Sequence, residues 1–460
     1  MAEQDEKAKL YHQLVLRVGE ERLLHEMRVH GFWPWNEEIP PDPPAEVAES
    51  KSLEAEIANL QQQHSKIKNP EKALAEERKR RWEESKKRRA EAKKKRAAEA
   101  VARQANWNKQ REANVVHAGA GVSAGLQQTQ SNLEQLTARG LPILHTANDI
   151  AKAMNIPLRS LRWLTYHRRG ATVVHYHRYK IAKKTGGVRC ISAPKAALKQ
   201  AQNWVQENLL AKLAVEPEAH GFVPTRSIVS NAVGHVGKAL VINLDMKDFF
   251  PSITYRRVKG LFEKFGYSEH AATVLALLCT EPPRVAAEFE GKVYHVSLGQ
   301  RVLPQGASTS PTITNLLCRK LDRRLAGLAK KHGFTYTRYA DDLTFSGDEP
   351  KAIGKLLRSV RSILKEEGLT EHPTKTKVMR RSNRQEVTGV VVNHKPTIAR
   401  EEVRKLRAIL HNAAKTGLEA QNREQHPNFT EAIRGRIAYI CMVDPQRGAV
   451  LKAAFEQLQT

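Results

Sequence analysis

The sequence predicts an α+β protein preceded by a mostly α-helical N-terminal extension. Residues 45–113 are dense in Glu, Lys, Arg and Ala and contain few helix breakers, which favours a long helix. Residues 239–244 form a continuous apolar run of the kind found in strands that are buried on both faces. The segments on either side of Asp341 and Asp342 are rich in β-branched and aromatic residues, so they are predicted to form a β-hairpin.

Composition points to a polyanionic partner. The chain has 460 residues, a formal net charge of +27 and an isoelectric point near 9.9, and this excess of positive charge predicts a nucleic-acid partner. No run approaches the roughly 18 to 20 apolar residues of a spanning helix, and the acidic start of the chain is unlike a secretory signal, so no membrane partner is expected. The four cysteines lie far apart, which argues against a zinc site or a disulfide framework and predicts reduced thiols in a cytoplasm.

The N-terminal part is expected to fall into three segments. Residues 1–44 combine a short helix with an arm rich in proline and tryptophan, whose aromatic rings either dock on another domain or stack on bases. Residues 45–116 are predicted to form one long charged helix, with acid-before-base pairs four residues apart such as Glu77 and Arg81. Its basic clusters form either a surface for phosphates or a solvated spacer. Residues 117–135, rich in Gly, Ala, Ser and Gln, are predicted to be a linker.

Three aspartates form the predicted centre of the chemistry. Asp341 and Asp342 are expected to make the turn of the hairpin, where two adjacent carboxylates repel each other unless a cation neutralises them. Mg²⁺ prefers such oxygen ligands, and a solvated turn is the alternative. Asp245 follows the buried strand at 239–244, where a rigid scaffold presents its carboxylate, and capping of the next helix is the alternative.

Two loops carry further residues suited to ligand binding. Residues 179–194 are predicted to form a β-hairpin with a Gly-Gly turn, which carries Lys184 and Arg189. A basic hairpin of this kind can hold a triphosphate. Gln305 and Gly306 precede an amphipathic helix, and the glycine allows the backbone to approach a ligand closely.

In this order the pieces resemble the palm of a reverse transcriptase. They are a strand ending in Asp245 with a Phe-Phe pair after it, a Pro-Gln-Gly loop at residues 304–306 before a helix, and the hairpin Tyr339-Ala340-Asp341-Asp342. No single motif carries the resemblance, which spans roughly residues 140 to 455.

The resemblance narrows to the retron reverse transcriptases of bacteria. Asn231-Ala232-Val233-Gly234-His235 is similar to that family's Asn-Ala-x-x-His element, and Val387-Thr388-Gly389 is similar to its Val-Thr-Gly element. The chain departs from the family at His372-Pro373-Thr374-Lys375-Thr376, where many members have Asn-x-x-Lys-Thr. It also departs in the N-terminal extension, which shorter members lack.

The resemblance implies an architecture and a reaction. The architecture is a right-hand polymerase with fingers over residues 136–238, a palm with an antiparallel sheet over 239–395 and a helical thumb over 396–460. The reaction is RNA-directed DNA polymerisation, a nucleotidyl transfer by a two-metal mechanism that uses two Mg²⁺ ions, with Mn²⁺ as a substitute. The implied metal ligands are the carboxylates of Asp245, Asp341 and Asp342 and the backbone of Met246.

The resemblance also implies which residues hold the incoming deoxynucleoside triphosphate. These are Lys184, Arg189, Phe250, Gln305, Gly306 and Lys375. Phe250 is expected to lie under the sugar, where its ring would collide with a 2′ hydroxyl, and a core phenylalanine is the alternative.

Finally, the resemblance implies nucleic-acid and protein partners. A retron enzyme binds its cognate structured noncoding RNA and copies part of it into multicopy single-stranded DNA joined to the RNA at a branch, in anti-phage defence with an accessory protein. Only 71 residues (460 − 389) follow Gly389, so no ribonuclease H domain is expected and template removal would rely on host ribonuclease H. The implied RNA-binding residues are Asn231, His235, Val387, Thr388, Gly389, Arg400, Arg404, Lys405, Arg407, Arg434 and Arg436.

Two alternatives to a retron enzyme are considered. The first is a group II intron-like or other bacterial reverse transcriptase. The sequence has no Cys/His endonuclease pattern, which argues against a mobile-intron enzyme. The second is a catalytically silent RNA-binding scaffold. Retention of Asp245, Asp341 and Asp342 argues against the scaffold, because clustered carboxylates repel each other without their metals.

Overall fold

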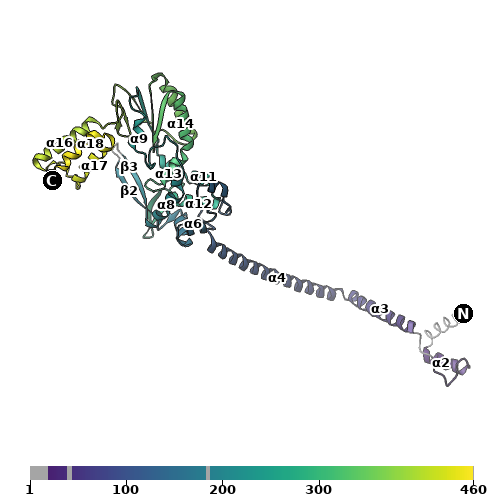
Figure 1. Cartoon of the computed structure of the whole chain (residues 1–460). Helices are drawn as coiled ribbons and strands as arrows, with labels where there is room; N and C mark the ends of the chain where they lie inside the picture. Colours follow the sequence, from purple (N-terminus) through teal and green to yellow (C-terminus); the bar gives the residue numbers. More distant parts are fainter. Residues whose placement is uncertain (1–18, 39–43, 183–186, 459–460) are drawn as a thin grey trace. The chain divides into compact units, whose positions relative to one another are not determined.

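The computed structural model describes residues 19–38, 44–182 and 187–458 (Figure 1). The chain divides into two compact units, residues 1–104 and residues 105–460, and each is described by itself. In the described part of the chain, no helix combines the length and the apolar character needed to cross a membrane. All four cysteines are free thiols.

The first unit consists of solvent-exposed helices. They are α2 (Glu20–Val29), α3 (Pro44–Lys68) and most of α4 (Pro70–Ala113). The prediction of one continuous helix is wrong, because the helix is interrupted at Asn69. Pro70 lacks an N–H group, and its ring disfavours helical backbone at the residue before it. The predicted pair of Glu77 and Arg81 is present on α4, with 3.0 Å between Oε1 and Nε.

The segment predicted to be a linker packs into the core of the second unit. Ala118, Val122 and Leu126 are all buried. The N–H group of His167 donates to the carbonyl oxygen of Ala118 at 2.7 Å, which ties this segment to the rest of the unit. A linker is therefore the wrong interpretation of its first half: the small residues allow close approach of the backbone, and the apolar residues between them enter the core.

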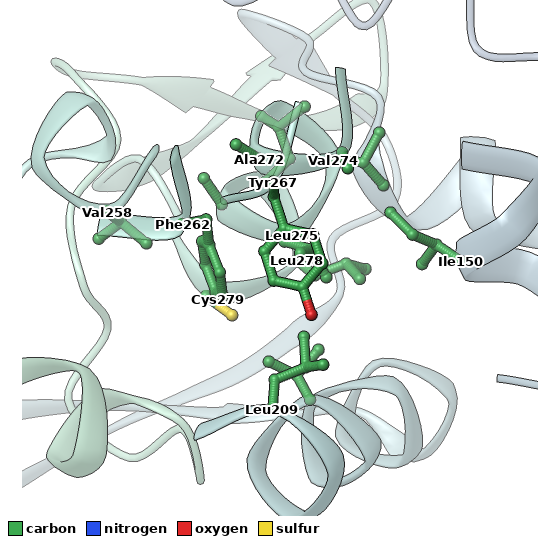
Figure 2. Packing of buried hydrophobic residues seen from close by; sticks show 14 of the residues in the cluster. Ile150, Leu209, Val258, Phe262, Tyr267, Ala272, Val274, Leu275, Leu278 and Cys279 are labelled. Atoms are coloured by element: carbon green, nitrogen blue, oxygen red, sulfur yellow. The ribbon is translucent and has the colours of Figure 1, made fainter. Parts of the chain in front are cut away.

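Helices build the first core of the second unit. They are α5 (Leu133–Ala138), α6 (Ala147–Ala153), α7 (Leu158–Thr165), α8 (Ala196–Asn208), α11 (Tyr255–Phe265) and α12 (Glu269–Cys279), with the short η1 (Leu210–Lys212). Helix α12 is buried from His270 to Cys279, so helices and loops surround it on all sides. Figure 2 shows Leu275 and Leu278 of α12 in this core with Phe262 and Tyr267, whose ring centroids lie 6.5 Å apart.

A four-stranded antiparallel sheet lies at the centre of the second unit. Its strand order is β7 (Phe334–Tyr339), β8 (Asp342–Gly347), β4 (Leu240–Asp245) and β9 (Lys377–Arg380). Alternate residues of β4 enter different cores: Ile242 and Leu244 pack with α14 (Arg319–Lys331) and α15 (Ile353–Glu366), whereas Val241 packs with the C-terminal helices. The prediction that this apolar run is a strand buried on both faces is therefore confirmed.

The remaining elements complete the second unit. The basic segment predicted to be a hairpin is a hairpin, formed by β2 (Tyr176–Ala182) and β3 (Val188–Pro194). A second sheet has the order β1 (Gly170–Ala171), β6 (Lys292–Ser297) and β5 (Arg284–Phe289), and β10 (Glu386–Val387) pairs with β11 (Val390–Val391). The other helices are α9 (Ile228–Val233), α10 (Phe249–Ser252), α13 (Ser310–Leu317), η2 (Pro350–Ala352), α16 (Arg400–Thr416), η3 (Glu419–Gln421), α17 (Phe429–Val443) and α18 (Pro445–Glu456).

Candidate active site

The sheet brings three carboxylate residues together from two distant parts of the chain. Strand β4 ends at Asp245, and β8 begins at Asp342, and these two residues are partners in the antiparallel register. Cross-strand partners have their Cβ atoms about 4.5 to 5.5 Å apart. The N–H group of Met246 donates to the carbonyl oxygen of Asp341 at 3.0 Å, which fixes the third aspartate beside the other two.

The turn of the β7–β8 hairpin differs from the prediction. Tyr339 pairs with Asp342, so the two turn residues are Ala340 and Asp341, and Asp342 is the first residue of β8. Ala340 has a φ of 57°, a left-handed conformation that is uncommon for a residue with a side chain. Gly221 lies against this turn, since a Cβ atom at residue 221 would come within 2.6 Å of the backbone nitrogen of Ala340. The close backbone contact helps to hold the turn in its strained form.

A buried network of polar side chains forms hydrogen bonds to the turn of the β7–β8 hairpin. Arg338 and Asp322 form a two-pronged ion pair, with Nε–Oδ1 and Nη2–Oδ2 distances of 2.8 and 2.7 Å. The Nη1 atom of Arg338 also donates to Asn315 Oδ1 at 2.8 Å and to the carbonyl oxygen of Ala340 at 3.2 Å. Asn315 in turn donates to the carbonyl oxygen of Gly221 at 2.9 Å. The carbonyl oxygens of Ala340, in the turn, and Gly221, beside it, therefore both accept hydrogen bonds from this side-chain network.

The three aspartates carry more negative charge than their surroundings neutralise. Burial, together with the nearby carboxylates of Asp341 and Asp245, raises the pKa of Asp342 to about 7. Burial also raises the pKa of Asp341, and Asp245 adds to that effect. The ammonium group of Lys375 partly offsets the charge, because its Nζ lies 3.0 and 2.9 Å from the two carboxylate oxygens of Asp245. A bound cation would relieve the remaining repulsion.

The three aspartates supply the carboxylate oxygens that a magnesium site needs, but their side chains do not form a complete set of metal ligands. In residues 19–38, 44–182 and 187–458, no three or more His, Cys, Asp or Glu side chains are grouped so that they could hold a metal ion. The ammonium group of Lys375 lies on Asp245, where it takes the place of a cation. Carboxylate oxygens are nevertheless the donors that Mg²⁺ selects, and this ion usually completes its shell with water and substrate phosphates.

Four of the six predicted nucleotide-binding residues line one cavity of about 710 Å³. Its walls include the three aspartates together with Arg189, Phe250, Gln305 and Lys375. Phe250 is half-buried and also packs against the helical core, so its ring lies at the boundary between core and cavity. Lys184 lies outside the described residues.

Gly306 contributes to the cavity through the position of the hairpin rather than by lining it. Its φ is 117°, and a Cβ atom there would come within 2.8 Å of the side chain of Ile191. The N–H group of Ser192 donates to the carbonyl oxygen of Gln305 at 2.8 Å. The Gln-Gly loop therefore packs directly against β3, the strand that carries Arg189.

Sequence reasoning missed several residues that line the same cavity. Asn243, Lys247, His372 and Lys377 all belong to its walls. Asn243 precedes Asp245 by two residues on β4, and strand periodicity places them on the same face, which is the signal that could have found it. Its amide donates to the carbonyl oxygen of Glu386 at 2.8 Å, and its Oδ1 is buried with no hydrogen-bond partner among the described residues.

Two of the predicted RNA-binding residues are in the wrong environment for that role. His235 is fully buried, and its Nδ1 and Nε2 atoms lie 2.6 and 2.8 Å from the hydroxyls of Ser346 and Thr337. Burial lowers its pKa to about 4, so the imidazole is neutral. Asn231 is also fully buried. His235 links the turn after α9 to β7 and β8, and the Asn231 amide donates to the Thr388 hydroxyl at 3.4 Å. The prediction of these buried side chains as RNA contacts is therefore wrong.

The other predicted RNA-binding residues lie in two places. Val387 is buried in the core, so it has no contact surface for RNA, whereas Thr388 is half-buried and Gly389 is exposed at the turn between β10 and β11. The basic residues on α16 and α17 are all exposed: Arg400, Arg404, Lys405, Arg407, Arg434 and Arg436. Their role in RNA binding stays a prediction.

Comparison with known proteins identifies the family of the chain. Residues 181–404 match the family model described as reverse transcriptase (RNA-dependent DNA polymerase). Retron Mx162 reverse transcriptase of Myxococcus xanthus is 44% identical over 374 residues, which cover 76% of this chain and 76% of the relative. Retron Ec86 reverse transcriptase of Escherichia coli is 34% identical over 316 residues, which cover 68% of this chain and 89% of the relative.

Among solved structures, the chain is similar to a telomerase of Candida albicans in complex with a fragment of telomeric RNA. The TM-score is 0.38 at 12% identity, and the match covers 62% of this chain and 56% of that one. The retron relatives match at 44% and 34% identity over two thirds or more of this chain. The chain belongs to the retron reverse transcriptases.

Proposed function

We propose that the chain copies part of a structured noncoding RNA into single-stranded DNA that remains joined to the RNA, using Asp245, Asp341 and Asp342 to hold two Mg²⁺ ions. One observation above all supports this: Asp245 and Asp342 are cross-strand partners at the edge of a cavity that also contains Arg189 and Phe250. The fingers, palm and thumb boundaries at residues 136–238, 239–395 and 396–460 belong to the same proposal.

The metal ions would be held by the three carboxylates and by the backbone of Met246. When bound, they activate the 3′ hydroxyl of the growing strand and stabilise the charge on the leaving pyrophosphate. The chain's own part is to keep the donor oxygens in position. The buried Arg338–Asp322 pair does this by fixing the hairpin turn, and β4 does it from the other side.

The rest of the cavity orients the incoming nucleotide. Arg189 has the planar guanidinium that suits phosphate oxygens, and it lies on β3 at the rim of the cavity. Lys375, whose ammonium group lies beside Asp245, would contact the phosphates. The Phe250 ring excludes the 2′ hydroxyl, and Gln305 with Gly306 shapes the pocket for the base pair.

The proposal extends to the biological reaction. The exposed basic residues of α16 and α17 would contact the phosphates of the noncoding RNA, whose stem is recognised by shape. The product would be a branched RNA–DNA molecule, formed in the cytoplasm, trimmed by host ribonuclease H and used with an accessory protein in anti-phage defence. The names of the relatives support the retron part of this proposal.

Primer extension on an annealed RNA template tests the catalytic assignment. We expect the Asp341→Ala, Asp342→Ala double variant to lose DNA synthesis while it keeps its affinity for RNA. A matched control is Asp348→Ala, which removes an exposed aspartate that follows β8 and lies outside the cavity. Synthesis at the wild-type rate by the double variant would refute the assignment.

Sequencing of copurifying nucleic acid tests the retron reaction separately. We expect a DNA strand attached to RNA at an internal 2′ hydroxyl. Linear DNA complementary to many unrelated RNAs would instead support a reverse transcriptase of another class.

A further inference from the structure

A groove lined by aromatic rings and arginines lies near the start of the second unit. Its volume is about 670 Å³, and its walls include Trp107, Trp163, Tyr166, Arg162 and Arg168. It shares no residue with the cavity that contains the three aspartates. Nothing in the proposed polymerase reaction accounts for it.

The aromatic rings of the groove are held in place but remain open to solvent. Trp163 packs edge-on against His175, with ring centroids 4.3 Å apart, and a ring nitrogen of His175 lies 3.0 Å from the carbonyl oxygen of Trp163. Even so, 51% of Trp163 and 41% of Tyr166 are exposed. Exposed rings with a fixed orientation are suited to stacking against flat ligands.

The wall of the groove formed by residues 114–117 is also held in place, by contacts with α7 and the residues after it. Arg162 donates from Nη2 to the carbonyl oxygen of Asn114 at 2.9 Å. A Cβ atom at Gly119 would come within 2.1 Å of the carbonyl oxygen of His167, so this part of the chain is pressed against the end of α7. The groove is therefore formed before any ligand arrives, and a ligand does not have to bear the entropic cost of ordering it.

The charge around the groove is strongly positive. The described residues that line the groove include Arg162 and Arg168 and no Asp or Glu. The guanidinium of Arg168 lies 5.1 Å from the centroid of the Tyr166 ring. Burial, together with the neighbouring arginines 301, 284 and 169, lowers the pKa of His167 to about 4, which is consistent with the same positive potential.

We propose that this groove binds a single-stranded segment of RNA. Bases would stack on Trp163 and Tyr166, and the guanidinium groups of Arg162 and Arg168 would contact the backbone phosphates. An acid-free wall that contains the exposed Arg168 favours a polyanion over an apolar protein segment, because burial of this charge against apolar side chains would be unfavourable. The proposal rests on the proposed function only in that the chain works on RNA, and it gives that RNA a second contact outside the active site.

Fluorescence anisotropy with a short fluorescein-labelled oligouridylate tests the proposal in the full chain. The titration contains neither Mg²⁺ nor nucleotides, so its outcome is independent of whether the chain polymerises DNA. We expect Trp163→Leu and Tyr166→Leu each to weaken binding by about fivefold or more, with an unchanged dependence of affinity on salt. Trp163→Phe keeps an aromatic face and is expected to restore most of the affinity.

Charge and ring contributions are separated by a second variant. We expect Arg168→Gln to reduce the slope of log affinity against log salt concentration by about 0.7 to 1. Arg168 is exposed, so its substitution should leave the fold intact. The Arg168→Gln variant therefore tests RNA binding by the groove even if a tryptophan variant fails to fold. The matched control is Phe289→Leu, which removes a ring that is 64% exposed on β5 and should bind the probe like the wild type.

Two outcomes would overturn the proposal. One is wild-type affinity and salt dependence in folded Trp163→Leu, Tyr166→Leu and Arg168→Gln variants, which would leave the groove as a surface for a protein segment or for no partner. The other is an equal loss of affinity for double-stranded RNA of the same length, because stacking on open rings requires unpaired bases.

Discussion

Arg338 and Asp322 form a bidentate ion pair in which both side chains are 0% exposed. The pair lies directly below the hairpin turn that carries Asp341, and Arg338 also bonds the carbonyl oxygen of Ala340 in that turn. A buried charge without its partner is strongly unfavourable, so this contact links the stability of the second unit to the geometry of the active site.

Removal of one partner of this pair should be severely destabilising. We expect Asp322→Ala to lower the free energy of unfolding by about 3 to 5 kcal/mol, because the Arg338 guanidinium remains buried and uncompensated. Urea denaturation followed by circular dichroism measures the loss. The control is Lys452→Ala, which breaks an ion pair with Glu456 whose side chains are both 62% exposed and should cost less than about 1 kcal/mol. Similar losses in the two variants would contradict the role of the buried pair.

A methyl group behind the hairpin turn should disturb the reaction. We expect Gly221→Ala to displace the turn, because its Cβ atom would lie 2.6 Å from the nitrogen of Ala340. Displacement of a catalytic group by about 1 Å can cost about a hundredfold in rate, so primer extension should slow by one to two orders of magnitude. Gly234→Ala is the control, since the nearest atom to its Cβ would be at 3.7 Å. Equal rates for both variants would show that the turn is fixed by other contacts.

The buried histidine predicts a dependence of stability on acid. The pKa of His235 is lowered to about 4 by burial, against about 6.5 in the unfolded chain. The unfolded chain therefore binds more protons between these values, and stability is present above about pH 6.5 and is lost as the pH falls towards 4, by roughly 3 kcal/mol for this group.

Denaturation of His235→Gln across the same pH range measures this contribution. We expect the variant to be less stable than the wild type at neutral pH and to lose less stability on acidification, because glutamine does not titrate. Its affinity for RNA at neutral pH should be unchanged, because the side chain is buried. Parallel pH profiles for the two proteins would show that His235 does not titrate with unfolding.

The choice of sugar should depend on the aromatic ring at the edge of the cavity. We expect Phe250→Val to incorporate ribonucleotides much more readily than the wild type, because the smaller side chain leaves room for a 2′ hydroxyl. Competition between deoxynucleoside and ribonucleoside triphosphates in primer extension measures the preference. Phe289→Val is the control, because this exposed ring lies outside the cavity. An unchanged preference in Phe250→Val would leave its ring as a packing residue only.

Local sequence patterns predicted the elements that position the carboxylates. The apolar run at residues 239–244 indicated a strand buried on both faces, and alternate residues of β4 do enter two different cores. The residues around Asp341 and Asp342 indicated a hairpin, and they form one. Each of these patterns is short-range, because strand propensity and side-chain alternation act within a few residues.

Other predictions failed where distant residues decide the outcome. The segment that begins at residue 117 has the composition of a linker, yet Val122 and Leu126 enter the helical core. Asn231 and His235 were predicted as RNA contacts, but both side chains are fully buried. Burial at such positions depends on elements a hundred or more residues away, such as Thr337 and Ser346 for His235.

The sequence by itself determined that Asp245 ends a buried strand, that Asp341 and Asp342 belong to a hairpin, and that the chain is strongly basic. Only the tertiary structure decided that Asp245 and Asp342 are cross-strand partners, that Ala340 rather than Asp342 occupies the turn, and that Arg338 supports it from below. The physical reason is that secondary structure follows from neighbouring residues, whereas strand register and the pairing of buried charges are set by packing between segments that are far apart in the chain.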